Sequence, residues 1–258
     1  MKSAAFTYHR ARDVAGAVRL ASELEDAKFI AGGQSLVAMM NFRLARPAHL
    51  VDLGPLRPEL SFIRREGEGL RIGALTTHHE VESASVGGFQ FLTNAMPWIG
   101  HLPIRTRGTI GGSLAHGDAT AEWCMLALLL DAEIVAEGPG GRRTIPAAEL
   151  FLGFFTTALE PDEMIVEIFF PHPAPRAALT EFAERRGDFA IVAAAVDLDA
   201  GALVLGGVAP APVRLPLTGG TFAEHAEAAV AAVPPEDRHR QALTRTLVLR
   251  ACEEAAAQ

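Results

Sequence analysis

The sequence predicts an α+β protein with two domains, and three observations support this prediction. Near the N-terminus, the order strand, glycine loop, helix, strand indicates a small βαβ unit with parallel strands. The proline-rich segment 171–175 is typical of a linker. Beyond it, three β segments separated by short turns precede two helices. We therefore expect domains at 1–172 and 176–258, the second with a three-stranded antiparallel sheet plus helices.

The N-terminal elements follow from periodicity and from residues that start or stop helices. Asp13 is a candidate N-cap for a helix over 13–24, whose apolar residues fall on one face. A buried strand is expected at 28–31, followed by a helix over 36–44 with Ser35 as its N-cap. A strand at 49–53 completes the unit.

The remaining elements are predicted in the same way. A hairpin turns at 67–69, and Thr77 with Glu80 resembles a capping box that begins a helix. The other expected helices span 91–100, 119–131, 222–233 and 237–257, and the other expected strands span 133–136, 142–145, 164–170, 179–186, 190–197 and 202–208.

Composition excludes several classes of function. The chain has 258 residues, 49% of them hydrophobic, and a net charge of −8 without a Lys/Arg cluster, which argues against a nucleic-acid partner. Its two cysteines, Cys124 and Cys252, form no C-x-x-C motif, so the chain alone cannot ligate an iron–sulfur cluster or structural zinc through thiolates. No stretch approaches 18 apolar residues. We expect a cytoplasmic, soluble protein without a transmembrane segment.

Two glycine loops are the strongest functional signal. In the first loop, Ala31-Gly32-Gly33-Gln34-Ser35-Leu36, the glycine pair follows a strand and precedes a helix. The second loop, Thr109-Ile110-Gly111-Gly112-Ser113, repeats the order β-branched residue, Gly-Gly, small polar residue. Glycine lets a ligand approach the backbone closely, and amide N–H groups at a helix start attract anions. Two matched loops could hold a diphosphate from opposite sides.

Other polar residues allow a structural and a functional interpretation. Asp52 lies where a dinucleotide-binding fold keeps its ribose-binding acid, but G-x-G-x-x-G is absent, so an acid ending a strand is the simpler explanation. Adjacent histidines His78 and His79 make a poor chelate on a helix and are expected to face solvent. Asp118 could cap the following helix or contact a ligand. Glu122, in the first turn of that helix, could accept hydrogen bonds from hydroxyl groups, and no metal site is expected.

The catalytic motifs searched for are missing. The sequence has no G-x-S-x-G elbow, P-loop or zinc-ligand set, and no pair of carboxylates stands out as an acid/base couple. Binding loops with few acids and bases are typical of proteins whose redox cofactor carries the chemistry. The residues thus indicate a protein that binds a dinucleotide or a flavin, and they do not identify its reaction.

Longer motifs resemble a known family. The first loop together with Arg43, Pro47 and Val51-Asp52-Leu53 resembles the first FAD motif of molybdenum-hydroxylase flavoprotein subunits, the family of carbon monoxide dehydrogenase medium subunits and the xanthine dehydrogenase flavin region. Residues 104–118 resemble its second motif, and 186–190 and 206–212 resemble signatures of its C-terminal domain. The resemblance covers nearly the whole chain.

The resemblance implies a fold and a set of cofactor-binding residues. The fold would be a two-lobed FAD-binding domain of the p-cresol methylhydroxylase type, with lobes at about 1–55 and 56–172, followed by the smaller C-terminal domain. Both glycine loops would hold the pyrophosphate through backbone N–H groups. The implied cofactor-binding residues are Ala31, Gly32, Gly33, Gln34, Ser35, Leu36, Thr109, Gly111, Gly112, Ser113, Asp118, Glu122, Ile165 and Phe189. Ile165 and Phe189 would lie near the flavin ring, and Phe189 could instead be a core residue.

Three positions depart from the family pattern. Pro103 replaces a usual Gln, and Ala119 replaces a usual Pro. Glu181 stands where many relatives carry a Lys near the flavin, which places the tuning of the flavin potential in question.

The function implied by the resemblance is electron transfer within a larger complex. Non-covalent FAD would take electrons from an iron–sulfur small subunit carrying [2Fe-2S] clusters and pass them to an external acceptor. The substrate would be hydroxylated on a molybdenum–pterin large subunit, in an (αβγ)2 heterohexamer. Two alternatives remain open from the sequence, a self-sufficient flavin oxidase or reductase of the same fold and a non-redox nucleotide-binding regulatory module.

Overall fold

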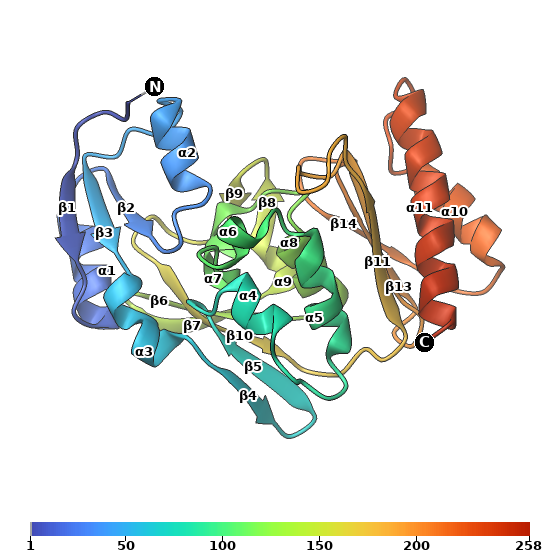
Figure 1. Cartoon of the computed structure of the whole chain (residues 1–258), viewed down its shortest axis with the longest axis horizontal. Helices are drawn as coiled ribbons and strands as arrows, with labels where there is room; N and C mark the ends of the chain where they lie inside the picture. Colours follow the sequence, from blue (N-terminus) through green and yellow to red (C-terminus); the bar gives the residue numbers. More distant parts are fainter. Residues whose placement is uncertain (1) are drawn as a thin grey trace.

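The computed structural model describes residues 2–258 and arranges them around three larger sheets that follow one another along the chain (Figure 1). The N-terminal lobe contains a parallel sheet of strand order β1-β3-β2. Its elements are β1 (Thr7–Arg10), α1 (Val14–Glu23), β2 (Ala27–Ile30), α2 (Leu36–Asn41) and β3 (His49–Asp52). The predicted parallel βαβ unit is therefore confirmed, and β1 is an additional strand that the sequence did not predict.

Local signals explain where the helices of this lobe begin. Asp13 is the N-cap of α1, and its Oδ1 accepts a hydrogen bond from the Gly16 N–H at 2.6 Å, as predicted. Asp52 ends β3 and accepts from the Gly54 N–H at 2.9 Å and from the Tyr8 hydroxyl at 2.5 Å. The structural interpretation of Asp52 thus holds.

The central lobe is built on an antiparallel sheet of order β4-β5-β10-β6-β7. The predicted hairpin and the Thr77/Glu80 capping box are both present. The elements are 3₁₀ turns at Gly54–Leu56 and Met96–Trp98, helices α3 (Arg57–Leu60), α4 (His78–Glu82), α5 (Gln90–Ala95), α6 (Leu102–Arg105), α7 (Ile110–His116), α8 (Glu122–Leu129) and α9 (Ala147–Leu150), and strands β4 (Ile63–Glu66), β5 (Gly69–Gly73), β6 (Glu133–Gly138), β7 (Gly141–Pro146), β8 (Phe151–Gly153), β9 (Thr156–Thr157) and β10 (Met164–Phe170).

The C-terminal domain contains an antiparallel sheet of order β11-β12-β13-β14, so the prediction of three strands was wrong. The fourth strand is a short edge strand that ends in a proline, and its alternation is too brief to be recognised in the sequence. The elements are β11 (Ala177–Phe182), β12 (Val192–Asp197), β13 (Ala202–Gly206), β14 (Val213–Pro216), α10 (Phe222–Val230) and α11 (Arg238–Ala256).

Helix α8 joins the two domains. All of its residues are buried and apolar except Glu122, which is typical of a helix enclosed on every side. It packs against β12 and β13, while α11 covers the opposite face of that sheet and α10 packs against α11 (Figure 1). One apolar core thus extends from the central sheet through α8 to the inner face of the C-terminal sheet. Within residues 2–258, no helix has the length and apolar character needed to cross a membrane.

Candidate functional site

The first glycine loop connects β2 to α2. Gly33 has a φ of +73°, a left-handed conformation that favours glycine, and α2 begins at Leu36. Ser35 precedes the helix, but its hydroxyl makes no capping hydrogen bond, so the predicted capping by its side chain is not observed. The Gln34 side chain instead donates to the Gly32 carbonyl at 3.1 Å, which folds the loop over itself.

The backbone of this loop offers a row of free donors. Among the residues that the structure describes, the N–H groups of 32–36 have no hydrogen-bond acceptor, whereas the next one, of Val37, donates to the Gly33 carbonyl at 3.0 Å. Exposed N–H groups at the start of a helix form a binding place for anions. The first loop can therefore supply backbone hydrogen bonds to a phosphate group.

The second loop is held differently. The N–H groups of Ile110 and Gly111 donate to the carbonyls of Thr76 at 3.1 Å and Ala74 at 2.9 Å, and the Gly112 N–H donates to Thr109 Oγ1 at 3.1 Å. The expectation that this loop offers its own N–H groups was therefore wrong for these three residues. The reason is that the loop pairs with the preceding segment and starts α7 at once, which uses the donors internally.

Glycine nevertheless matters in both loops because they touch. A Cβ on Gly32 would lie 2.0 Å from the carbonyl oxygen of Arg107, just before the second loop, so only glycine fits there. A Cβ on Gly111 would lie 2.6 Å from Cβ of Ala74, and one on Gly112 would face Ala31 at 3.8 Å. The structure thus brings together two loops separated by almost eighty residues. Free amides on one side and a glycine surface on the other fit a diphosphate.

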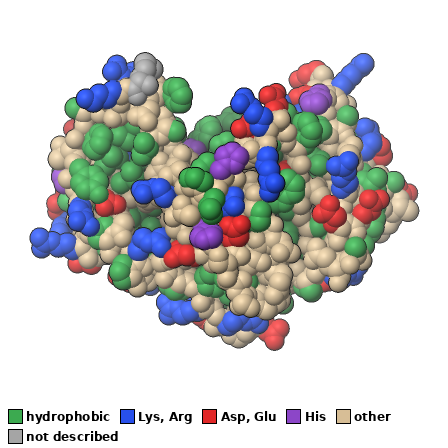
Figure 2. Space-filling view, viewed as in Figure 1, with side chains coloured by type: hydrophobic (Ala, Val, Ile, Leu, Met, Phe, Trp, Pro, Cys, Tyr) green, Lys and Arg blue, Asp and Glu red, His purple; other side chains and the backbone are tan. Residues whose placement is uncertain are grey.

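The contact lies beside a hollow in the surface. Figure 2 shows the molecule deeply notched between the N-terminal lobe and the rest, and in Figure 1 α2 borders this gap on one side. An elongated ligand can enter the notch and lie between the lobes.

Asp118 and Glu122 follow directly after α7. Asp118 Oδ1 accepts from the N–H and the hydroxyl of Thr120, both at 2.8 Å, so it stabilises the turn before α8. The N-cap residue of α8 is Ala121, which means that Asp118 does not cap this helix directly. Glu122 is only 8% exposed, and burial raises the pKa of its carboxyl to about 7. The hydrogen bond from its own backbone N–H lowers the pKa, but by less than burial raises it.

Glu181 forms a second buried carboxyl near Glu122. Thr180 on β11 donates its hydroxyl to the Leu247 carbonyl of α11, so the next side chain, Glu181, points to the opposite face of the sheet, toward α8. Burial, and next the Glu122 carboxylate, raise the pKa of Glu181 to about 8. Its Oε2 is buried and has no hydrogen-bond partner within the described chain. Two buried carboxyls from different domains therefore both have raised pKa values, and the charge of Glu122 acts on Glu181.

The last two predicted residues lie in different surroundings. Ile165 is buried on β10 beside a bulge in its pairing with β6. Phe189 is 62% exposed in the loop between β11 and β12. This loop contacts the central lobe, because a Cβ on Gly187 would lie 2.6 Å from the His101 ring. The alternative interpretation of Phe189 as a core residue is wrong, since its ring is open to solvent.

His78 is a structural residue that the sequence placed wrongly. It is 5% exposed instead of facing solvent, and its Nδ1 accepts a hydrogen bond from the Trp123 indole N–H at 2.9 Å. Its backbone N–H donates to the Gly108 carbonyl at 3.0 Å, directly before the second loop. Burial, and next the Arg105 charge, lower the pKa of His78 to about 4, so the ring is neutral. His79, by contrast, is exposed as expected.

Comparisons with known proteins agree with this geometry. A family model described as "FAD binding domain in molybdopterin dehydrogenase" matches residues 4–173. The alpha subunit of the 6-hydroxypseudooxynicotine dehydrogenase complex of Paenarthrobacter nicotinovorans is 44% identical over 200 residues, which cover 76% of this chain and 67% of that protein. The carbon monoxide dehydrogenase medium chain of Hydrogenophaga pseudoflava is 40% identical over 196 residues, covering 74% and 68%.

Solved structures extend the likeness to the whole chain. A chain of the Hydrogenophaga pseudoflava carbon monoxide dehydrogenase superposes with a TM-score of 0.92 at 34% identity, covering 100% of this chain and 99% of that one. A chain of quinoline 2-oxidoreductase from Pseudomonas putida 86 gives a TM-score of 0.91 at 31% identity, with the same coverage. The fold and the paired loops define an FAD-binding oxidoreductase subunit. The chain belongs to the family of FAD-binding domains in molybdopterin dehydrogenases, which confirms the resemblance seen in the sequence and its cofactor, FAD.

Proposed function

We propose that this chain is the electron-transfer subunit of a multi-subunit molybdenum hydroxylase. Bound FAD supplies the redox chemistry: it takes electrons from an iron–sulfur subunit and gives them to an external acceptor. The observation that carries the proposal is the backbone contact of the two glycine loops, with the free amides of the first loop beside it. The relatives named above are subunits of dehydrogenase complexes, which supports the same division of work.

The residues of this chain bind and orient the cofactor in the proposal. The first loop, residues 31–36, would donate its N–H groups to the pyrophosphate, and Thr109, Gly111, Gly112 and Ser113 would pack against the other side. Glu122 and Asp118 would contact the chain between the pyrophosphate and the ring, while Ile165 and Phe189 would border the ring. The proposed domain limits are 1–172, with lobes at about 1–55 and 56–172, and 176–258.

The chain's own cysteines support the need for partners. Cys124 and Cys252 are both fully buried, in different cores, and burial raises the pKa of each thiol, so neither favours the thiolate needed to bind iron. We propose that a small subunit carries the [2Fe-2S] clusters and a large subunit the molybdenum–pterin, in a cytoplasmic (αβγ)2 heterohexamer. Size-exclusion chromatography with light scattering on the co-expressed subunits measures this stoichiometry.

A visible absorption spectrum of the purified chain, before and after acid precipitation, tests the proposal. Flavin bands that move to the supernatant are expected and indicate non-covalent FAD. A colourless protein that takes up no added FAD would refute the proposal and favour a regulatory module. Reduction of the flavin by an organic substrate added to the chain alone would instead indicate a self-sufficient oxidase.

A further inference from the structure

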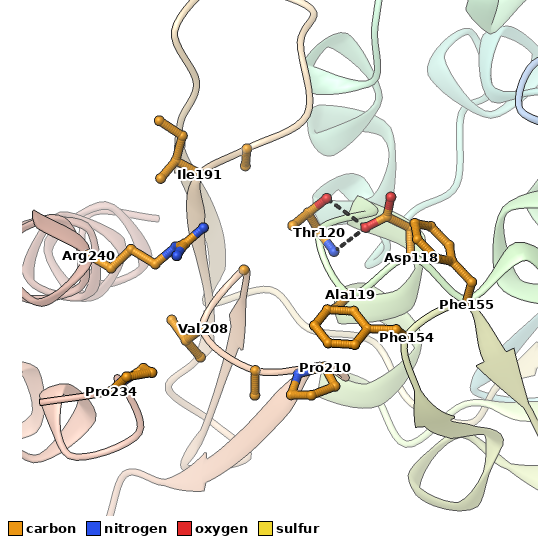
Figure 3. Close-up of a pocket in the computed structure, with 13 residues that line it drawn as sticks. Asp118, Ala119, Thr120, Phe154, Phe155, Ile191, Val208, Pro210, Pro234 and Arg240 are labelled. Carbon is orange, nitrogen blue, oxygen red and sulfur yellow. Dashed lines mark hydrogen bonds between the residues drawn. The ribbon is translucent and has the colours of Figure 1, made fainter. Parts of the chain in front are cut away.

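A cavity of about 420 Å³ lies between the two domains, next to the proposed cofactor site (Figure 3). The central lobe contributes the turn before α8 and the tip of the β8–β9 hairpin, and the C-terminal domain contributes the rest. The residues that border it are Asp118, Ala119, Thr120, Phe154, Phe155, Ala190, Ile191, Gly207, Val208, Ala209, Pro210, Pro234 and Arg240. Its size is within the range of small-molecule sites. Asp118 and Ala190, the neighbour of Phe189, connect it to the residues proposed to hold FAD.

The walls of this cavity are apolar and partly aromatic. Phe154 is 71% exposed at the hairpin tip, and Figure 3 shows its ring beside Pro210 on the opposite domain. Phe155 has a φ of +48°, which a bulky residue rarely adopts, and its ring lies against the His116 ring with centroids 4.9 Å apart. Such backbone outliers often mark functional sites. Exposed aromatic rings that border a cavity fit a flat, apolar ligand.

One charged hydrogen-bond donor borders this apolar surface. Arg240 Nη1 pairs with Asp237 Oδ2 at 2.8 Å, whereas its Nη2 makes no hydrogen bond within the part of the chain that the structure describes, and the side chain is 43% exposed. Figure 3 shows the guanidinium directed from α11 into the space between Ile191 and Val208. Hydrogen bonds from a charged guanidinium are strong, so a carbonyl oxygen of a ligand in the cavity would be a suitable acceptor for Arg240 Nη2.

We propose that this cavity binds a quinone, the external acceptor left open by the proposed function on which this inference rests. Two electrons and two protons pass from the reduced flavin to the quinone, which gives oxidised FAD and the quinol. The cavity would hold the quinone ring against Phe154, with Arg240 Nη2 donating to one carbonyl oxygen. A nicotinamide dinucleotide fits less well, because its diphosphate needs positive charge. Arg240 is the one cation among the bordering residues, and Asp237 already pairs with it. Asp118 would in addition repel the diphosphate.

Binding of menadione, a soluble naphthoquinone, to the FAD-loaded chain tests this proposal by isothermal titration calorimetry. Arg240→Gln should weaken binding by about tenfold, since a hydrogen bond from a charged donor is lost. Ile191→Trp should abolish it by filling the cavity. Arg238→Gln, an exposed arginine of the same helix outside the cavity, is the matched control and should bind like the wild type.

A kinetic measurement complements the titration. The chain is reduced with dithionite without oxygen, and reoxidation by menadione is followed at the flavin band. The reoxidation rate of the wild type should saturate with increasing menadione concentration. The Arg240→Gln chain should need about tenfold more menadione to reach half of its maximal rate.

The outcomes separate this proposal from the function on which it rests. A colourless chain refutes the proposed function. Three results with a yellow chain would refute only the quinone cavity. The chain could bind no menadione, it could bind menadione equally after Arg240→Gln and Ile191→Trp, or it could bind NADH in place of menadione.

Discussion

Replacing Glu122 by glutamine should make the stability of the chain less sensitive to alkaline pH. Glu122 lies at the start of α8, between the central lobe and the C-terminal sheet, and Asp118 is the charge that acts on its carboxyl. Burial raises the pKa of Glu122 to about 7, because a carboxylate is poorly solvated there. The folded state therefore prefers the protonated carboxyl, which glutamine imitates in shape and in hydrogen-bonding capacity.

The size of the effect follows from the pKa of the folded chain. A carboxyl whose pKa is raised in the folded chain stabilises the fold fully at a pH below its ordinary pKa. This stabilisation is lost as the pH rises through the pKa of the folded chain. The interval from the ordinary value of 4.5 to about 7 corresponds to about 3 kcal/mol in the free energy of unfolding. Wild type should lose about this amount between pH 4.5 and pH 8 through Glu122, and Glu122→Gln should retain it.

Urea denaturation of the FAD-free chain at several pH values measures this difference. The fluorescence of Trp123, which is fully buried next to Glu122, reports unfolding. Glu184→Gln, at an exposed position of the C-terminal domain, is the control and should follow the wild-type curve. If Glu122→Gln loses stability with rising pH as steeply as the wild type does, the carboxyl is not the buried neutral group described above.

Three further changes test other parts of the site. Gly32→Ala should prevent FAD retention in a folded chain, because the new methyl group would lie 2.0 Å from the Arg107 carbonyl oxygen and separate the loops. The ratio of flavin absorbance to protein measures the FAD retained. His78→Ala should lower the free energy of unfolding by about 2 kcal/mol in urea denaturation, since the Trp123 indole N–H loses its buried acceptor. Arg214→Ala breaks an ion pair between β14 and the turn after α8 and should cost less than about 1 kcal/mol, yet speed proteolysis of the 171–175 linker.

These changes have internal controls. Gly140→Ala alters a glycine with open space around it and should retain FAD like the wild type. Equal retention of FAD by Gly32→Ala would contradict the close contact of the loops. Unchanged stability of His78→Ala, or unchanged proteolysis of Arg214→Ala, would contradict the structural role given to that residue.

Short-range signals predicted much of the fold. Asp13 starts α1 and Thr77 with Glu80 starts α4 because caps act within one helical turn. The parallel pairing of β2 with β3 and the antiparallel C-terminal sheet followed from the lengths of the connections. The failures were of another kind. β14 is a short edge strand stabilised by its neighbour, and the burial of His78 depends on an indole 45 positions away.

The sequence by itself determined the class of protein and its glycine loops, because glycine acts through the local backbone and the long motifs carry the family resemblance. Only the tertiary structure decided which loop keeps its N–H groups free, since those of the second loop bind carbonyls some thirty-five residues earlier. It also decided that the charge of Glu122 acts on Glu181, and that Phe154 and Arg240 border one cavity. The last two relations join different domains, and burial and charge act through space, not along the chain.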